Sequence, residues 1–145
     1  MSIQPVGQSF GRLVVDQKSV WIGTSWKMNK GPAEAIAAAR ALESFQPPEG
    51  IRSFVIPPFT SLRDMCSVLE DSALLVGAQN MHWEDSGAWT GEVSAPMIAE
   101  CGASIVEIGH SERRQHFGET DWTVNLKVCL LYTSDAADDT PCVDL

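Results

Sequence analysis

The sequence has no hydrophobic run of 18 residues, the length that an α-helix needs to cross a bilayer. We therefore expect no membrane partner, and 44% apolar residues in a chain of 145 predict a single globular domain. The first twenty residues have neither a continuous apolar stretch nor a small-residue cleavage site, so no signal peptide is predicted. We expect a cytoplasmic protein. Residues 1–20 are expected to be an N-terminal extension without fixed structure, and the alternative is that the start codon was assigned too far upstream.

Basic residues are scarce, because 10 Lys and Arg stand against 19 Asp and Glu, a formal net charge of −9. Nucleic-acid binding needs clustered Lys and Arg, so no nucleic-acid partner is expected. An anionic ligand would have to be held by a single Lys or by helix N-termini. The four cysteines have no Cys-x-x-Cys spacing and no His at metal-ligand spacing. This pattern argues against a zinc or other metal site and predicts reduced thiols.

Residues 129–145 differ in character from the rest of the chain. They contain four Asp, no Lys or Arg, and no helical or strand period. Back-translated, residues 129–139 resemble a common transposase sequencing adapter. We therefore interpret residues 129–145 as a non-native tail joined to a truncated gene, and the alternative is a natural acidic tail.

Short apolar runs alternate with helix-like segments, a pattern typical of βα units on a parallel sheet and of the α/β class. Four strands are predicted, over residues 20–23, 53–56, 73–78 and 104–108. Helices are predicted over residues 32–45, 60–69 and 96–101 and from Thr120 to about 128, with Thr60 and Ser94 as caps and Gly102 as a stop. In the first helix, a buried stripe of Ile36, Ala39, Leu42 and Phe45 is expected. The sequence thus predicts four βα units.

Polar residues follow the fourth predicted strand at once, since Gly109 is succeeded by His110, Ser111, Glu112, Arg113 and Arg114. Residues just past the carboxyl ends of parallel strands open onto the ligand crevice. A helical turn starting at Ser111 would direct one ring nitrogen of His110 towards backbone N–H groups and leave the other facing the crevice. This arrangement favours a neutral, proton-shuttling ring. The alternative is a surface His beside a solvated Glu-Arg-Arg run.

Four motifs resemble the triosephosphate isomerase family, in the family's order and over about residues 21–128. They are Trp26-Lys27-Met28-Asn29, Gly77-Ala78-Gln79-Asn80, Gly87-Ala88-Trp89-Thr90-Gly91-Glu92, and Gly109-His110-Ser111-Glu112-Arg113-Arg114 with Phe117-Gly118-Glu119-Thr120. The resemblance implies a (β/α)8 TIM barrel of about 250 residues, of which residues 21–128 would form the first four βα units. This truncated barrel would lack the carboxylate base and the phosphate-binding loops, so little or no turnover is expected from it.

The resemblance implies roles for three side chains in an intramolecular isomerase. Lys27 would meet the substrate phosphate and the developing enolate oxygen, His110 would polarise the substrate carbonyl and move protons between its two oxygens, and Glu112 would hydrogen-bond near Lys27. The implied reaction interconverts glyceraldehyde 3-phosphate and dihydroxyacetone phosphate through an enediolate, in glycolysis and gluconeogenesis, without a cofactor. Because the abstracted proton is weakly acidic, the enediolate needs donors fixed in advance.

The resemblance also implies a homodimer. Thr90 and Glu92 would form the tip of a loop that enters a neighbouring subunit. There Thr90 would support the other active site and Glu92 would pair with that subunit's Arg113. His82 and His116 receive no functional role. Packing or interface roles are expected for three tryptophans, Trp83, Trp89 and Trp122.

One departure from the family bears on the substrate. Ser25 stands where most members have Asn beside the substrate, which leaves more room there. Three stretches, Thr-Ser-Trp-Lys-Met-Asn-Lys, Ile-Pro-Pro-Phe-Thr and Gln-Asn-Met-His-Trp, look more like the bacterial branch that isomerises four-carbon substrates such as L-erythrulose 1-phosphate. Triose phosphate is the first choice and the tetrulose phosphate the alternative.

Two alternative interpretations of the sequence predict a protein that is not an isomerase. A non-catalytic half-barrel fragment would expose the edge of its fourth strand and associate through it. A flavodoxin-like binding domain would need a glycine-containing phosphate loop after the first strand, and residues 24–29 contain no Gly.

Overall fold

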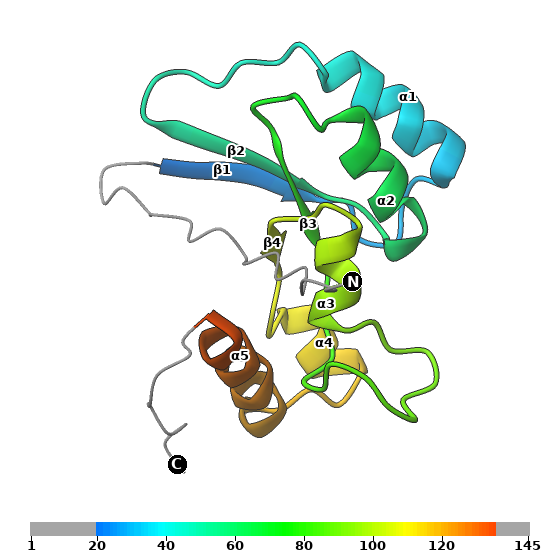
Figure 1. Cartoon of the computed structure of the whole chain (residues 1–145), viewed down its shortest axis with the longest axis vertical. Helices are drawn as coiled ribbons and strands as arrows, with labels where there is room; N and C mark the ends of the chain where they lie inside the picture. Colours follow the sequence, from blue (N-terminus) through cyan, green and yellow to red (C-terminus); the bar gives the residue numbers. More distant parts are fainter. Residues whose placement is uncertain (1–19, 136–145) are drawn as a thin grey trace, which may run out of the picture.

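The computed structural model describes residues 20–135. The four predicted strands are β1 (Val20–Ser25), β2 (Ile51–Ile56), β3 (Leu75–Ala78) and β4 (Ile105–Val106). They pair in parallel in the order β1-β2-β3-β4, so every βα unit adds its strand beside the preceding one. The resulting sheet curls in one direction (Figure 1). This is the arrangement of the first four units of a (β/α)8 barrel, and it excludes a flavodoxin-like sheet, whose strand order reverses.

Five helices connect or follow these strands in the described part of the chain. They are α1 (Pro32–Leu42), α2 (Phe59–Val68), α3 (Ala95–Glu100), α4 (Ser111–His116) and α5 (Asp121–Asp135). Helices α1 and α2 lie side by side against the sheet, whereas α3, α4 and α5 gather at the other end of the molecule (Figure 1). None of the helices within residues 20–135 has the length and apolar character needed to span a membrane.

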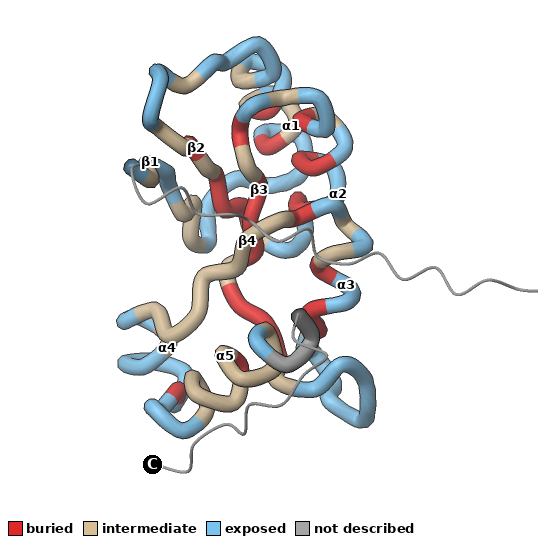
Figure 2. Tube along the Cα trace, turned by 60° about the vertical axis from the view of Figure 1, so that its left-hand side comes forward, coloured by how far each residue is buried: buried red, intermediate tan, exposed pale blue. Residues whose placement is uncertain are grey.

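The hydrophobic core lies between the sheet and the helices that cover its outer face. Val55 and Val76 of the strands pack with Leu62 and Met65 of α2 in one buried cluster. Figure 2 shows the buried residues concentrated in the middle strands and in the inward faces of the helices, whereas the peripheral loops are exposed. The core therefore holds the carboxyl ends of the strands at one edge of the sheet.

The buried stripe expected on α1 is wrong in detail. Ala35 and Ala39 are fully buried, whereas Ile36 is only half-buried and Phe45 is 39% exposed. Residues four apart stay on one helix face, but a spacing of three drifts by about 60° at each step. In addition α1 ends at Leu42, so Phe45 lies beyond the helix.

Helix ends follow the predicted signals in most places. The Ser94 side chain accepts a hydrogen bond from the Met97 N–H at 3.5 Å, and Gly102 ends the helix with a φ of +92°. The predicted cap at Thr60 is wrong, because Pro58 occupies the cap position of α2 and its carbonyl accepts the Ser61 N–H at 3.0 Å. Helix α2 thus begins directly after Pro58, whose own backbone is still extended.

The predicted change of structure at residue 129 is not seen in the backbone. Helix α5 continues through this position to Asp135, and Leu130 and Leu131 pack against the core cluster. The contacts of these two leucines with the core stabilise the last turns of α5. The local sequence pattern did not predict these turns. The interpretation of 129–145 as a non-native tail stays a prediction, and residues 1–19 and 136–145 lie outside the described residues.

The described cysteines differ in state. Cys66 and Cys101 are free thiols, as expected. Cys129 is disulfide-bonded, so the prediction of reduced thiols is wrong for this residue. No group of three or more potential metal ligands occurs within residues 20–135.

Candidate active site

The end of β4 positions His110. Gly109, with a φ of +72°, turns the chain so that His110 caps α4, and the His110 carbonyl accepts the N–H groups of Arg113 and Arg114 at 2.9 and 3.1 Å. Nδ1 of the His110 ring accepts the Glu112 N–H at 3.1 Å. The prediction that one ring nitrogen faces backbone N–H groups is therefore confirmed. Because Nδ1 acts as an acceptor, a neutral ring carries its proton on Nε2.

The end of β1 positions Lys27. Its backbone has a φ of +54°, a left-handed conformation that side-chain-bearing residues rarely adopt. The Gln79 side chain, at the end of β3, donates to the Lys27 carbonyl at 2.9 Å and to the Ile56 carbonyl at 3.3 Å. Gln79 thus ties the ends of three neighbouring strands together, and this contact holds Lys27 in its strained conformation.

Lys27 and His110, 83 positions apart in the sequence, meet at the carboxyl edge of the sheet. Lys27 Nζ contacts Nε2 of His110. An ammonium group has only donors, and Nε2 of the neutral ring is also a donor. Lying side by side, the two nitrogens offer donors to an oxygen that binds next to them. The geometry suits an oxyanion or a polarised carbonyl.

Two carboxylates flank this pair. Glu112 Oε2 lies 4.0 Å from Lys27 Nζ and 3.7 Å from His110 Nδ1. Glu107 Oε1 lies 3.7 Å from Lys27 Nζ and 3.6 Å from His110 Nε2, and its Oε2 accepts a hydrogen bond from Ser25 Oγ at 2.9 Å. All four groups are partly exposed, and such pairs contribute little to folding stability. The two carboxylates place negative charge beside Lys27 and His110.

Sequence reasoning missed Glu107. It lies within the predicted fourth strand, where it was counted as part of an apolar run. A signal was available, because a carboxylate inside an otherwise apolar strand is seldom buried without a partner. The Glu107 N–H still continues the β-ladder, donating to the Ala78 carbonyl at 2.8 Å, so strand pairing fixes where its side chain emerges.

Sequence reasoning also missed a buried polar network beside the site. Lys127 of α5, whose side chain is 5% exposed, donates to Asn80 Oδ1 at 2.8 Å and contacts Glu119. Glu119 Oε2 lies 3.8 Å from Arg113 Nε. The network joins the end of β3 to α4 and α5. No spacing in the sequence indicates it, because it depends on three elements meeting in space.

Two of the three residues expected at a subunit interface lie on the surface, and Arg113 is half-buried. Thr90 and Glu92 are exposed on the loop between β3 and α3, where Gly91 has a φ of +93°. The Arg113 guanidinium lies 5.1 Å from the centre of the Phe117 ring. Glu92 and Arg113 line the same cavity of about 260 Å³. Their expected roles between subunits stay predictions.

The tryptophans near this loop surround a buried histidine. The His82 ring is 4.3 Å from Trp83 and 4.4 Å from Trp89 between ring centres, and its Nδ1 accepts the Glu84 N–H at 3.0 Å. Packing accounts for His82 and Trp83. Trp89, although its ring contacts His82, is 45% exposed, and Trp122 is 59% exposed.

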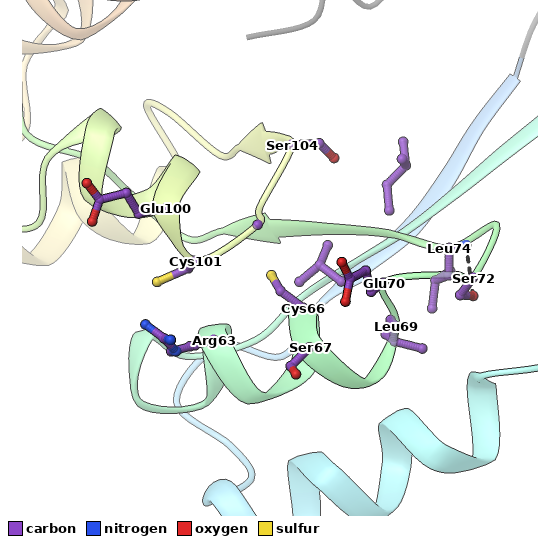
Figure 3. A pocket seen from close by; sticks show the side chains of 13 residues that line it. Arg63, Cys66, Ser67, Leu69, Glu70, Ser72, Leu74, Glu100, Cys101 and Ser104 are labelled. Carbon is purple, nitrogen blue, oxygen red and sulfur yellow. Dashed lines mark hydrogen bonds between the residues drawn. The ribbon is translucent and has the colours of Figure 1, made fainter. Parts of the chain in front are cut away.

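A larger cavity, of about 500 Å³, lies elsewhere, between α2, the start of β3 and the turn before β4 (Figure 3). Cys66 and Cys101 line it together. Burial and the neighbouring Cys101 raise the pKa of the Cys66 thiol to about 12. The cavity shares no residue with the Lys27 and His110 pair, so size alone does not identify the active site.

The sequential parallel sheet, with a lysine, an imidazole and two carboxylates at its carboxyl edge, defines a βα-barrel protein whose polar site is built at the strand ends. The family model described as triosephosphate isomerase matches residues 20–139. The chain belongs to the triosephosphate isomerase family.

Three similar curated relatives have the same name. The chain is 59% identical over 109 residues to the L-erythrulose-1-phosphate isomerase of Mesorhizobium japonicum, a match that covers 74% of this chain and 43% of the relative. It is 59% identical to the protein of the same name from Rhizobium rhizogenes, with 74% and 42% covered. For the Mycolicibacterium smegmatis protein of that name, identity is 58%, with 75% and 43% covered. The chain therefore spans less than half the length of these relatives.

Proposed function

We propose that the full-length protein to which this segment belongs isomerises L-erythrulose 1-phosphate. The names of relatives 58–59% identical to the chain support this four-carbon substrate, the alternative of the sequence analysis, over the triose phosphates that were its first choice. The single observation that carries an isomerase is that Lys27 Nζ and His110 Nε2, both donors, lie in contact at the strand ends.

The substrate chemistry needs such a pair. In L-erythrulose 1-phosphate the keto group at C2 adjoins C3, which carries a hydroxyl. Loss of the C3 proton gives an enediolate over C2 and C3, and protonation at C2 moves the carbonyl to C3. The C3 proton is weakly acidic, so the developing oxyanion must be stabilised by donors already in place. The Lys27 ammonium and the Nε2–H of His110 supply them.

The imidazole has a second task in this proposal. A proton must pass between the oxygens on C2 and C3 before the carbonyl can change position. The neutral His110 ring can give its Nε2 proton to one oxygen and take a proton from the other. The Glu112 N–H bonded to Nδ1 holds the ring in the tautomer that this transfer needs.

The remaining parts of the site belong to the proposal as well. By family resemblance, the carboxylate base and the phosphate-binding loops lie in the half of the barrel that follows this segment. The segment alone is therefore expected to turn over little or no substrate. A test must use a full-length barrel, for which we define a hybrid enzyme: residues 20–128 of this chain replace the matching segment of the Mesorhizobium japonicum relative. Identity of 59% favours compatible packing of the two halves.

The hybrid enzyme should be assayed with L-erythrulose 1-phosphate and, separately, with dihydroxyacetone phosphate. We expect isomerisation of both, with the higher kcat/KM for the four-carbon substrate. Turnover of the triose phosphate alone would restore the first choice. A folded hybrid that is inactive on both substrates would refute the proposal.

We also propose a cytoplasmic homodimer. Arg113 Nε is buried and makes no hydrogen bond within the described residues, although Glu119 lies near it. Glu92 of a second subunit is a chemically suitable partner, because a carboxylate accepts from a guanidinium. Thr90, at the exposed tip of the same loop, offers the position at which to test this association.

A further inference from the structure

Glu107 places a carboxylate in a site that is expected to bind a negatively charged substrate, which is unusual. Its Oε1 lies 3.7 Å from Lys27 Nζ and 3.6 Å from His110 Nε2, the two donors that face the reacting oxygens. Its side chain is 24% exposed. A carboxylate here repels both the substrate phosphate and the enediolate. Glu107 therefore weakens the binding of any substrate with which it makes no favourable contact of its own.

A carboxylate can make such a contact with a hydroxyl group. When ionised it is purely an acceptor, with about four lone-pair positions on two oxygens. Ser25 Oγ occupies one position on Oε2 at 2.9 Å and thereby fixes the orientation of the group. Further positions are left for a hydroxyl that enters the site. Ser25 comes from the end of β1 and Glu107 from the end of β4, so the pair is held by two strands.

The four-carbon substrate carries such a hydroxyl. L-erythrulose 1-phosphate has a hydroxymethyl group, C4, where the triose phosphate has a hydrogen. C4 is attached to C3, one of the two reacting carbons, so its hydroxyl lies close to the Lys27 and His110 donors in any productive pose. We infer that Glu107, oriented by Ser25, accepts a hydrogen bond from the C4 hydroxyl and thereby sets the preference for a four-carbon over a three-carbon substrate.

This inference rests on the proposed function and adds a specificity-determining residue to it. The discrimination arises mainly from the hydrogen bond to Glu107 that a three-carbon substrate cannot make. With a triose phosphate bound, the Glu107 carboxylate is desolvated, receives no hydrogen bond from the substrate and remains close to its negative charge. Replacing Glu107 by an apolar residue removes both the favourable contact with the four-carbon substrate and the penalty against the three-carbon one.

The test compares Glu107→Leu with the unmodified hybrid enzyme, and Glu100→Leu, an exposed position on α3, serves as the control. We expect Glu107→Leu to lower the kcat/KM ratio of L-erythrulose 1-phosphate to dihydroxyacetone phosphate on the order of 100-fold. The triose value should fall much less than the four-carbon value, because loss of the carboxylate also removes its repulsion of the substrate's negative charge. The control should keep the ratio. Equal loss on both substrates would indicate a merely structural role and overturn the inference.

A substrate analogue provides a second readout. The unmodified hybrid should disfavour 4-deoxy-L-erythrulose 1-phosphate, which has a methyl group in place of the hydroxymethyl, by a similar factor. Glu107→Leu should no longer distinguish the analogue from the substrate, because the hydroxyl then has lost its acceptor. If Glu107→Leu does not fold, Glu107→Gln gives the same comparison with a smaller ratio change.

The outcomes separate the two proposals. A hybrid that is inactive on L-erythrulose 1-phosphate refutes the proposed function and this inference with it. An active hybrid whose substrate ratio and discrimination against the analogue are unaffected by Glu107→Leu refutes the inference alone.

Discussion

The His110 ring is oriented by the Glu112 N–H at Nδ1, and its Nε2 lies next to the Lys27 ammonium. We expect His110→Gln in the hybrid enzyme to lower kcat by a factor on the order of 10² to 10⁴, because the proton relay and one oxyanion donor are weakened together. His116→Gln, an exposed residue of the same helix, should keep full activity. Steady-state kinetics, with circular dichroism as the check on folding, decides this, and undiminished turnover in His110→Gln would exclude the assigned role.

The two free thiols beside the larger cavity should differ in reactivity. Burial raises the pKa of Cys66 to about 12, so its nucleophilic thiolate is scarce at pH 8, whereas the Cys101 side chain is more accessible. Iodoacetamide should modify Cys101 well before Cys66 in the native chain. Peptide mass spectrometry over a time course measures both rates, and faster labelling of Cys66 would contradict its burial.

The same thiol predicts a pH dependence of stability. Its pKa rises from 9.0 to about 12 on folding, so the folded state holds the proton more tightly. The stabilising contribution is complete below pH 9 and is lost as the pH rises from 9 to 12. Urea denaturation of Cys66→Ala should therefore show a shallower loss of stability over this range than the unmodified chain. Equal slopes would mean that Cys66 does not contribute.

At the scale of single elements, the turn between β4 and α4 decides where His110 lies. Gly109 has a φ of +72°, and an added Cβ would lie 3.2 Å from a Val124 methyl group. Gly109→Ala should therefore destabilise the chain by roughly 2 kcal/mol, from left-handed strain together with crowding against α5. Gly50→Ala is the matched control, because Gly50 has a φ of +77° and open space around it. Chemical denaturation should show the larger loss for Gly109→Ala, and equal losses would mean that Val124 moves aside freely.

Strands and helix ends were predictable from the sequence where neighbouring residues alone determine them. Apolar runs gave all four strands to within a few residues, Gly102 and Ser94 marked both ends of α3, and family motifs brought Lys27 and His110 to one edge of the sheet. The continuation of α5 past residue 129 was not predictable, because contacts of Leu130 and Leu131 with the core stabilise it. Glu107 was overlooked because a strand pattern records only that a run is mostly apolar.

At the scale of the whole molecule, association should depend on the loop between β3 and α3. Thr90→Arg in the hybrid enzyme adds a long charged side chain at the exposed tip, which a tightly packed subunit interface would not accommodate. We expect monomers of low activity by sedimentation velocity. Thr60→Arg, on the exposed start of α2, should leave the dimer intact. A dimer unaffected by Thr90→Arg would argue against this loop as the interface.

The proposed catalysis requires Lys27 and His110 to act on one substrate at the carboxyl edge of the sheet. The most direct measurement follows proton exchange by NMR, with L-erythrulose 1-phosphate and the hybrid enzyme in D2O. The account predicts that the isomer forms with deuterium at C2, that recovered substrate gains deuterium at C3, and that His110→Gln slows both processes together. Formation of the isomer without deuterium at C2, or exchange at an undiminished rate in His110→Gln, would contradict it.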